Sequence, residues 1–69
     1  MIRLIDFMRA QQLDVPVVVT AMALQTSDDD FDAIAAIVVR HGGGPGFEVV
    51  EGVRSQGDHY TAFIATRTT

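Results

Sequence analysis

Cysteine and tryptophan are both absent from this chain of 69 residues. Without cysteine no disulfide can form, and no Cys/His cluster is present to hold a structural zinc ion. The length allows one domain, which buries only about 60% of the surface that its unfolded form exposes and is therefore marginally stable by itself. Oligomerisation is the remaining way to stabilise such a domain, and the apolar content of 48% agrees with it.

Basic residues are also scarce, since five stand against nine acidic residues and the net charge is −4. A nucleic-acid binder needs a basic stripe that contacts phosphates, so we expect no direct contact with nucleic acid, whereas a basic protein partner is compatible with this charge. No apolar run reaches the ~18 residues of a membrane span. The first residues, with Asp6 and no Ala-x-Ala-like end, make a poor signal peptide, and we expect a cytoplasmic protein without membrane contact.

The N-terminal segment over residues 2–13 consists mostly of good helix formers. One helical stripe is formed by Leu4, Ile5 and Met8. This pattern predicts a short helix that ends before the breaker at 14–16, and a strand over 2–7 is the alternative. Residues 17–24 predict a strand with two apolar faces. The main helix should cover one face, and either the N-terminal helix or a second subunit must cover the other.

The main helix is predicted over Phe31–Arg40. Ser27 or Asp28 is the expected N-cap, and the glycines at 42–44 end the helix. Its core stripe is Phe31, Ile34, Ala35 and Val38. Its opposite side carries Ala33, Ala36 and Val39. Because a small monomer would place charged residues there, we predict that this second set contacts another subunit, in a homodimer or a higher homo-oligomer.

Two further strands are predicted over 47–53 and 59–66, joined by a turn at 55–58. In the first of them, the residues expected on one face are Phe47, Val49 and Val53, interrupted by Glu51. Arg54, beside the turn, should pair with an acidic neighbour such as Glu48 or Asp58.

The order of these elements predicts a single α+β domain over residues 1–69. A short N-terminal helix or arm at 1–14 precedes a βαββ unit at 15–69. Its three-stranded, mainly antiparallel sheet packs on the one main helix. The third strand should lie between the first and the second, which leaves those two as the edges.

The run Gly46-Phe47-Glu48-Val49-Val50 follows the helix, and Tyr60-Thr61-Ala62-Phe63-Ile64 follows the turn. This pattern resembles small bacterial and phage βαββ domains of unknown function, whose helix leads into a Gly-Trp-Glu-Leu-Val strand. The resemblance covers about residues 17–67, and the family has no established activity to carry over. The helix entry Thr26-Ser27-Asp28-Asp29 is similar to that of the flavin-binding dodecins. Dodecins hold flavin with a Trp platform that this chain lacks, so no cofactor is expected.

The acidic run that opens the main helix is Asp28, Asp29, Asp30 and Asp32. Carboxylates stabilise the positive end of a helix dipole, so capping and a solvated acidic patch are the first interpretation. The functional interpretation is recognition of a basic partner, with these four residues as the partner-binding set. Weak binding of Ca²⁺ or Mg²⁺ is an alternative, although we predict no dedicated metal site.

The remaining candidates for chemistry are His41, His59 and Asp58. They could act as a general base only if the fold brought them together, and a histidine beside a turn is more often solvated or a cap. The letters His41-Gly42-Gly43-Gly44 match an esterase oxyanion-hole motif, but no nucleophile elbow accompanies them, so they are interpreted as a helix stop. We therefore predict no catalytic residue.

The function that we predict is a non-enzymatic protein-interaction module. Small regulators or inhibitors of a host protein, encoded by phages or accessory elements, have this format, and an anti-CRISPR protein is one concrete form. The alternative is an oligomeric small-ligand-binding protein of dodecin type. In that case an inter-subunit pocket would be lined by Phe47, Phe63 and Tyr60.

Overall fold

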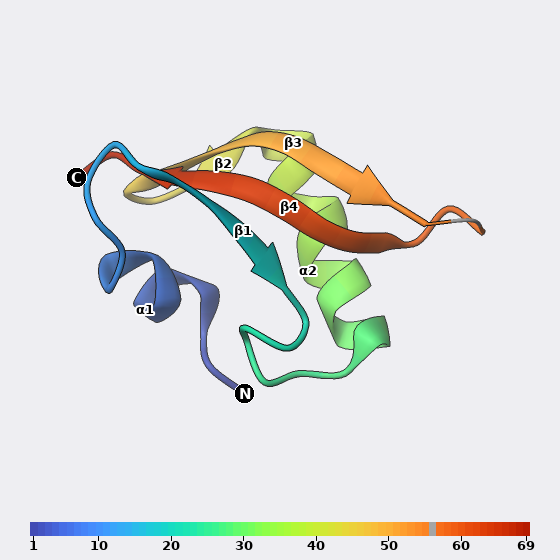
Figure 1. The fold of residues 1–69 in the computed structure, drawn as a ribbon. Helices are drawn as coiled ribbons and strands as arrows, with labels where there is room; N and C mark the ends of the chain where they lie inside the picture. Colours follow the sequence, from blue (N-terminus) through green and yellow to red (C-terminus); the bar gives the residue numbers. More distant parts are fainter. Residues whose placement is uncertain (56) are drawn as a thin grey trace.

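The computed structural model describes residues 1–55 and 57–69, which form two helices and four strands (Figure 1). In chain order these are α1 (Leu4–Arg9), β1 (Pro16–Thr20), α2 (Asp28–His41), β2 (Gly43–Gly44), β3 (Phe47–Arg54) and β4 (Tyr60–Arg67). All neighbouring strands pair antiparallel, in the order β1-β4-β3-β2. The predicted α+β class is confirmed, and β4 lies between β1 and β3 as expected. The sheet has four strands, however, and the prediction of three is wrong.

The additional strand consists of glycines that the sequence predicts only as a helix stop. Gly42 ends α2 in the left-handed conformation, with φ of 73°. Gly43 and Gly44 then pair with Glu48 and Phe47 at the start of β3. Because two residues without side chains carry no apolar alternation, the sequence gives no signal for this strand. The pairing covers Phe47 and Glu48 at the start of β3, so this part of β3 is not the open edge that the three-stranded prediction made it.

The strand β1 ends at Thr20, four residues before the predicted end at position 24. The Thr20 hydroxyl accepts a hydrogen bond from the Ala23 amide at 3.1 Å, and the Leu24 amide donates to the Thr20 carbonyl at 3.2 Å. The Thr20 side chain thus gives the backbone amide of Ala23 a hydrogen-bond acceptor that competes with pairing in the sheet. The chain turns here, and Leu24 folds back into the core with none of its surface exposed.

A β-bulge interrupts β3 where it pairs with β4. Val49 lies opposite Ala65 and Glu51 lies opposite Ile64, so Val50 is the additional residue between these two pairs. A bulge of this kind changes the face on which the following side chains lie.

The bulge corrects the predicted faces of β3. Beyond it, Gly52 lies opposite the buried Phe63, and Val53 lies on the other face of the sheet. Only Phe47 and Val49 face the core, and the prediction that Val53 joins them is wrong. A bulge follows from pairing with a distant strand, so local alternation cannot reveal it.

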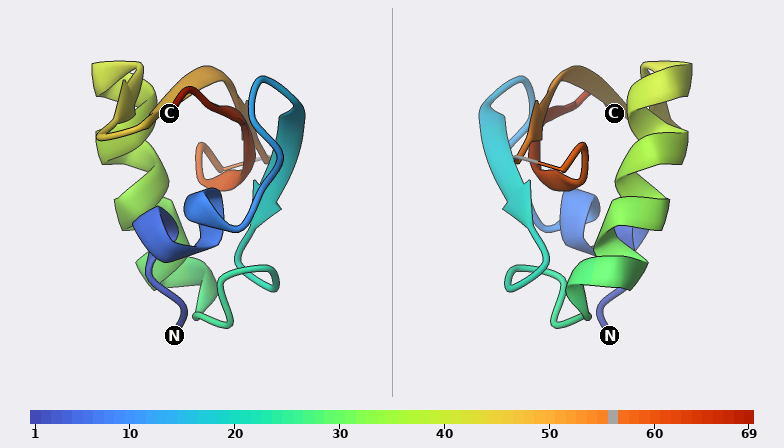
Figure 2. Two further views of the ribbon diagram at one scale, coloured as in Figure 1. Left: turned by 90° about the vertical axis from the view of Figure 1, so that its left-hand side faces the viewer. Right: turned by 90° about the vertical axis from the view of Figure 1, so that its right-hand side faces the viewer.

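The hydrophobic core lies between one face of the sheet and both helices (Figure 2). The Phe31 ring on α2 stacks on the Phe63 ring of β4, with ring centroids 5.5 Å apart and planes inclined by 12°. The buried set is Met8, Val19, Leu24, Phe31, Ala35, Phe47, Val49, Phe63 and Ala65. Phe31 and Ala35, one turn apart, thereby confirm the predicted stripe at these two positions.

Helix α1 packs on the same face of the sheet as α2 (Figure 2). It is shorter than the predicted segment 2–13. Met8 is only 2% exposed within the shared core, and Leu4 and Phe7 pack against that core. Helix α1 therefore does not cover the second face, where Val18 of β1 is 62% exposed. Of the two covers that the sequence predicts for this face, the N-terminal helix is excluded.

Candidate functional site

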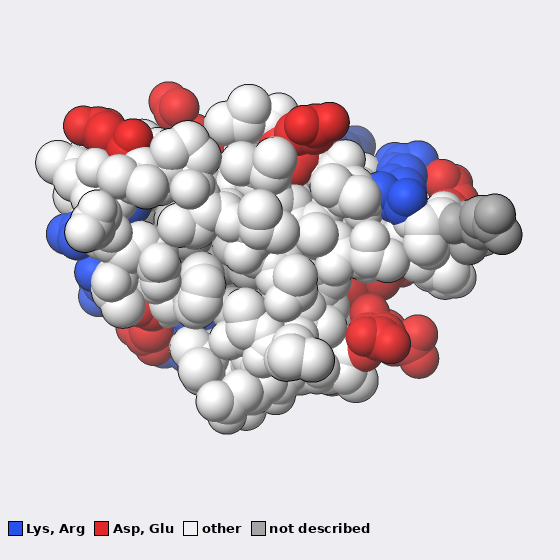
Figure 3. All heavy atoms as spheres, in the orientation of Figure 1, with Lys and Arg blue, Asp and Glu red and all other residues white. Residues whose placement is uncertain are grey.

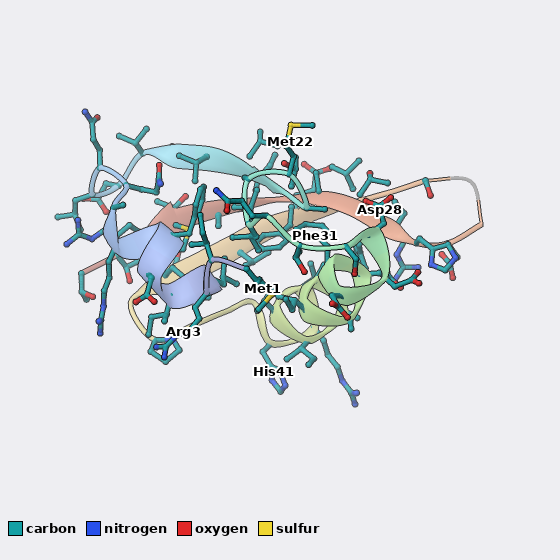
Figure 4. All side chains as sticks on the ribbon, turned by 90° about the horizontal axis from the view of Figure 1, so that it is seen from below. Met1, Arg3, Met22, Asp28, Phe31 and His41 are labelled. Carbon is teal, nitrogen blue, oxygen red and sulfur yellow. The ribbon has the colours of Figure 1, made fainter. Side chains whose placement is uncertain are left out.

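A pocket of about 270 Å³ lies where the first turn of α2 meets the turn between β3 and β4. Its lining consists of Ala21, Asp28, Asp29, Phe31, Ser55, His59, Tyr60 and Thr61. Figure 4 places Asp28 at the end of α2 nearest to this turn. Pockets for whole small-molecule ligands usually measure about 300–1,000 Å³. This pocket, which we call the acidic pocket, lies just below that range, and it has room for a long side chain of a partner.

The acidic side of the pocket is built by the N-terminal cap of α2. The Ser27 hydroxyl accepts a hydrogen bond from the Asp30 amide at 3.2 Å, which confirms Ser27 as the N-cap. The side chains of Asp28, Asp29 and Asp30 are exposed in this first turn. Within residues 1–55 and 57–69, no cationic group lies at ion-pair distance from these three carboxylates. Their negative charge is therefore available to a partner.

Asp32 differs from the other three predicted partner-binding residues. One carboxylate oxygen, Oδ1, accepts a hydrogen bond from the Tyr60 amide at 2.8 Å, and Oδ2 lies 3.2 Å from Nδ1 of His59. These contacts keep the pKa of Asp32 below its ordinary value, first through the Tyr60 amide and then through His59. The Asp32 side chain is 31% exposed. These contacts join α2 to the start of β4, so Asp32 stabilises the fold of its own chain.

Arg54 holds the opposite side of the pocket in place. Its Nη1 donates to Asp58 at 2.7 Å, and its Nη2 donates to the Tyr60 hydroxyl at 2.8 Å. The guanidinium carbon also lies 4.7 Å from the centre of the Tyr60 ring, a cation–π arrangement. The Tyr60 hydroxyl and then Asp58 raise the pKa of Arg54, so this residue stays charged. Of its two predicted partners, Asp58 is confirmed.

The two histidines and Asp58 do not converge. His59 contacts Asp32, while Asp58 contacts Arg54. His41 is the last residue of the 14-residue helix α2. It therefore lies about 20 Å along the helix axis from the acidic pocket (Figure 4). A catalytic site assembled from the three predicted candidates is not formed.

The predicted subunit contact on α2 is divided between two environments. Ala33 and Ala36 are exposed, as the prediction requires. Val39 is half-buried and packs against the core of its own chain, so its assignment to an outer surface is wrong. Ile37, which is 61% exposed, adds an apolar side chain to the outer side of the helix. A subunit contact at Ala33 and Ala36 stays a prediction.

The dodecin-type alternative needs three aromatic side chains at a subunit boundary. Phe63 is fully buried and Phe47 is 6% exposed, so both belong to the core of the single chain. Only Tyr60 of the three lines the acidic pocket. The predicted lining of an inter-subunit ligand pocket is therefore wrong for the two phenylalanines.

The described part of the chain contains no group of three or more His, Asp or Glu side chains arranged to hold a metal ion. The alternative of weak Ca²⁺ or Mg²⁺ binding at the acidic run thus gains no support. Among the described residues, neither helix has the length and apolar character needed to cross a membrane.

No protein-family model matches the chain, and no curated protein or solved structure is significantly similar to it. The resemblances to βαββ domains of unknown function and to dodecins therefore stay predictions.

Proposed function

We propose that the chain is a non-enzymatic protein-interaction module whose acidic pocket binds a basic segment of another protein. The observation that carries this proposal is the set of carboxylates in the first turn of α2 that have no ion-pair partner among the described residues. Asp28 and Asp29 line the pocket, and Asp30 is exposed beside them. Phe31 and Tyr60 supply apolar and aromatic walls against which the carbon chain of a Lys or Arg side chain can pack.

The electrostatics favour such a partner. The net charge of the chain is −4, and three of its nine acidic side chains lie at one helix end, which attracts a basic surface at long range and speeds encounter with it. The positive end of the dipole of α2 lies at the same residues, a place where negatively charged side chains are favourable.

Asp32 and His59, the titratable pair beside the acidic pocket, already contact each other within the chain. Both carboxylate oxygens of Asp32 have contacts within the chain, and His59, its partner, is 66% exposed at the rim. A general base needs a partner that orients it and a substrate held beside it in a site that excludes water. An exposed rim favours binding over catalysis, and the proposal therefore assigns no reaction.

A small acidic module of this kind suits a cytoplasmic regulator or inhibitor encoded by a phage or an accessory element. The acidic pocket would occupy a basic surface of a host protein, and an anti-CRISPR protein that blocks a nucleic-acid-binding surface is one concrete form. This step rests on size and charge, by analogy with known inhibitors.

The proposal is tested with fluorescein-labelled nonapeptides that contain Arg and Lys beside apolar residues, by fluorescence anisotropy at low and high salt. The variant Asp28→Asn/Asp29→Asn/Asp30→Asn removes the unpaired charges while it keeps polar side chains. The matched control is Asp14→Asn/Glu48→Gln/Glu51→Gln, which removes three exposed charges elsewhere.

We expect salt-sensitive binding to the wild type and to the control, and binding at least tenfold weaker to the first variant. Equal affinity of the two variants would show that only the net charge matters and would reject the pocket. No binding of any basic peptide by the wild type would reject the proposal as a whole.

A further inference from the structure

A second pocket, of about 350 Å³, lies at the end of the sheet opposite to the acidic pocket (Figure 1). Because β3 and β4 pair antiparallel, the start of β3 and the end of β4 meet here, and the turn between them lies at the other end. The volume falls within the range of about 300–1,000 Å³ that is usual for small-molecule pockets. The lining consists of Met8, Arg9, Pro45, Gly46, Arg67 and Thr69. We call it the basic pocket, because two of the five basic residues of the chain line it.

Three segments that are distant in the sequence build the basic pocket. Arg9 ends α1, the turn from β2 to β3 forms a second wall, and Arg67 ends β4. The Thr68 amide donates to the Gly46 carbonyl at 2.8 Å, which joins the end of the chain to that turn. The Asp14 amide donates to the Arg67 carbonyl at 2.9 Å, which joins the segment after α1 to β4. These main-chain bonds fix the walls of the pocket relative to one another.

Arg67 is held in place by two main-chain oxygens. Its Nη1 donates to the Gln11 carbonyl at 3.0 Å, and its Nε donates to the main-chain oxygen of Thr69 at 2.7 Å. The Thr69 oxygen occupies only the Nε side of the guanidinium, and Nη2 donates to no acceptor in residues 1–55 and 57–69. The side chain is half-buried and already ordered, so little rotamer freedom is lost when Nη2 binds a ligand.

Arg9 adds a second positive charge, and its guanidinium makes no ion pair or hydrogen bond in the described part of the chain. Arg67 likewise lies at ion-pair distance from no Asp or Glu side chain among the described residues. Arg67 pairs with the buried Phe47 and shares its face of the sheet, so Glu48 lies on the other face. Figure 3 shows arginine side chains in blue at the left-hand end, where Figure 1 places α1 and the C terminus.

We propose that the basic pocket binds the phosphate group of a small organic phosphate monoester. Such a group carries a charge of about −1.5 to −2 at neutral pH and three acceptor oxygens, so it can accept from guanidinium groups on two separate elements. A carboxylate has only two oxygens, which the fork of a single guanidinium satisfies. The Thr69 hydroxyl adds a neutral donor beside Gly46, since it lies 2.9 Å from the place that a Cβ atom on Gly46 would occupy.

A small ligand suits the charge of the chain better than a polyanion does. The net charge is −4, and the carboxylates of Asp28, Asp29 and Asp30 lie at the opposite end. At physiological salt the repulsion between exposed charges is largely screened beyond about 8 Å, so one phosphate group in the basic pocket is little affected by them. A nucleic acid would extend past the pocket along an acidic surface. The exposed Pro45 supplies an apolar wall for the organic part of a small ligand.

The test is a titration of the chain with phenyl phosphate, followed by amide NMR spectra at constant ionic strength in a buffer without phosphate. Inorganic phosphate and acetate are titrated in parallel. The variant Arg9→Gln removes an exposed cation that has no partner in the described chain, so its fold should be kept. The matched control is Arg40→Gln on α2, which makes the same change of charge at an exposed position outside the pocket. A second pocket variant, Arg67→Lys, keeps the charge but loses the planar fork.

We expect phenyl phosphate to shift the amide signals of Gly46, Thr68 and Thr69 with a Kd of about 1 mM or lower. Inorganic phosphate should bind at the same residues more weakly, and acetate more weakly still. Arg9→Gln should weaken the binding of phenyl phosphate about tenfold, the usual effect of losing a hydrogen bond between charged groups. Arg67→Lys should also weaken it, whereas the control Arg40→Gln should leave it nearly unchanged.

The absence of a saturable shift at these residues overturns the proposal. So does an equal loss of affinity in Arg9→Gln and Arg40→Gln, because only the net charge would then matter. Acetate bound as tightly as phenyl phosphate overturns the assignment of a phosphate group, and inorganic phosphate bound more tightly than phenyl phosphate overturns the assignment of an organic monoester. None of these outcomes depends on peptide binding at the acidic pocket, so the two proposals fail separately.

Discussion

Replacement of Gly52 by alanine is the most direct test of how α2 and the β3–β4 hairpin fit together. A Cβ atom at this position would lie 2.6 Å from Cε1 of Tyr60 and 3.0 Å from Cγ2 of Val39. Both distances are shorter than the van der Waals contact of two carbon atoms. The Tyr60 ring is held by Arg54, and Val39 is fixed on α2, so neither side chain moves away easily.

Two effects of opposite sign decide the result of this substitution. Alanine allows the unfolded chain fewer conformations than glycine does, and this difference stabilises the folded state by about 0.4–1 kcal/mol. Inserting a methyl group into an occupied space costs about 1–3 kcal/mol. We therefore expect Gly52→Ala to lose roughly 1–2 kcal/mol. In a domain of this size each kcal/mol lowers the Tm by about 4–8 °C, which thermal and urea unfolding both resolve.

The double variant Gly52→Ala/Tyr60→Val distinguishes a clash from a general weakening of the strand. Valine keeps the preference for a strand but has no atom near the Cε1 position of Tyr60. The cost of Gly52→Ala should therefore be smaller in the Tyr60→Val background, with a coupling of about 0.5–1 kcal/mol or more. An unchanged or raised Tm for the single variant would refute the bulge and the resulting position of Gly52.

Two further predictions concern Asp32 and the core. The pKa of Asp32 in the folded chain lies below its ordinary value of 3.8, so its contribution to stability is present above that value and is lost as the pH falls through it towards the lower folded pKa. Asp32→Asn should therefore show a lower Tm at neutral pH and a shallower fall of Tm between about pH 5 and pH 2 than the wild type, and parallel curves would contradict the role of Asp32. Phe63→Ala removes the buried ring that stacks on Phe31 and should cost about 3–5 kcal/mol, as much as the core of so small a domain supplies. Circular dichroism should show an unfolded chain, whereas the control Ile37→Ala on the exposed side of α2 should stay within about 0.5 kcal/mol of the wild type.

The features that the sequence predicts correctly depend on neighbours within one or two turns of chain. Ser27 as the N-cap and Gly42 as the stop of α2 follow from local backbone chemistry. The Phe31 and Ala35 stripe follows from the helical repeat, and the pair between Arg54 and Asp58 spans a single turn. Each of these features involves residues at most four positions apart in the sequence, so it can be predicted without knowledge of the remaining fold.

The features that the sequence does not predict depend on pairing between distant segments. Val39 is predicted on the same outer side as Ala33 and Ala36, but it lies at the border of that side. It reaches the sheet at Gly52, which the bulge places on the core face and which has no side chain to keep Val39 away. The contact between Asp32 and His59 joins residues 27 positions apart. A local signal for Asp32 does exist, since the buried Ala35 lies three positions after it on the helix, but this signal does not identify the partner.

The four aspartates at the start of α2 look alike in the sequence, but the structure separates them into two groups with different consequences. Asp32 joins the helix to Tyr60 and His59, so its replacement changes the wall of the acidic pocket as well as stability. Asp28 and Asp29 line the same pocket without an ion-pair partner in the described chain. Binding and folding should therefore respond separately. Loss of the unpaired carboxylates should weaken the attraction of a basic partner and change the Tm only through the helix dipole, whereas loss of Asp32 also removes its contacts with Tyr60 and His59.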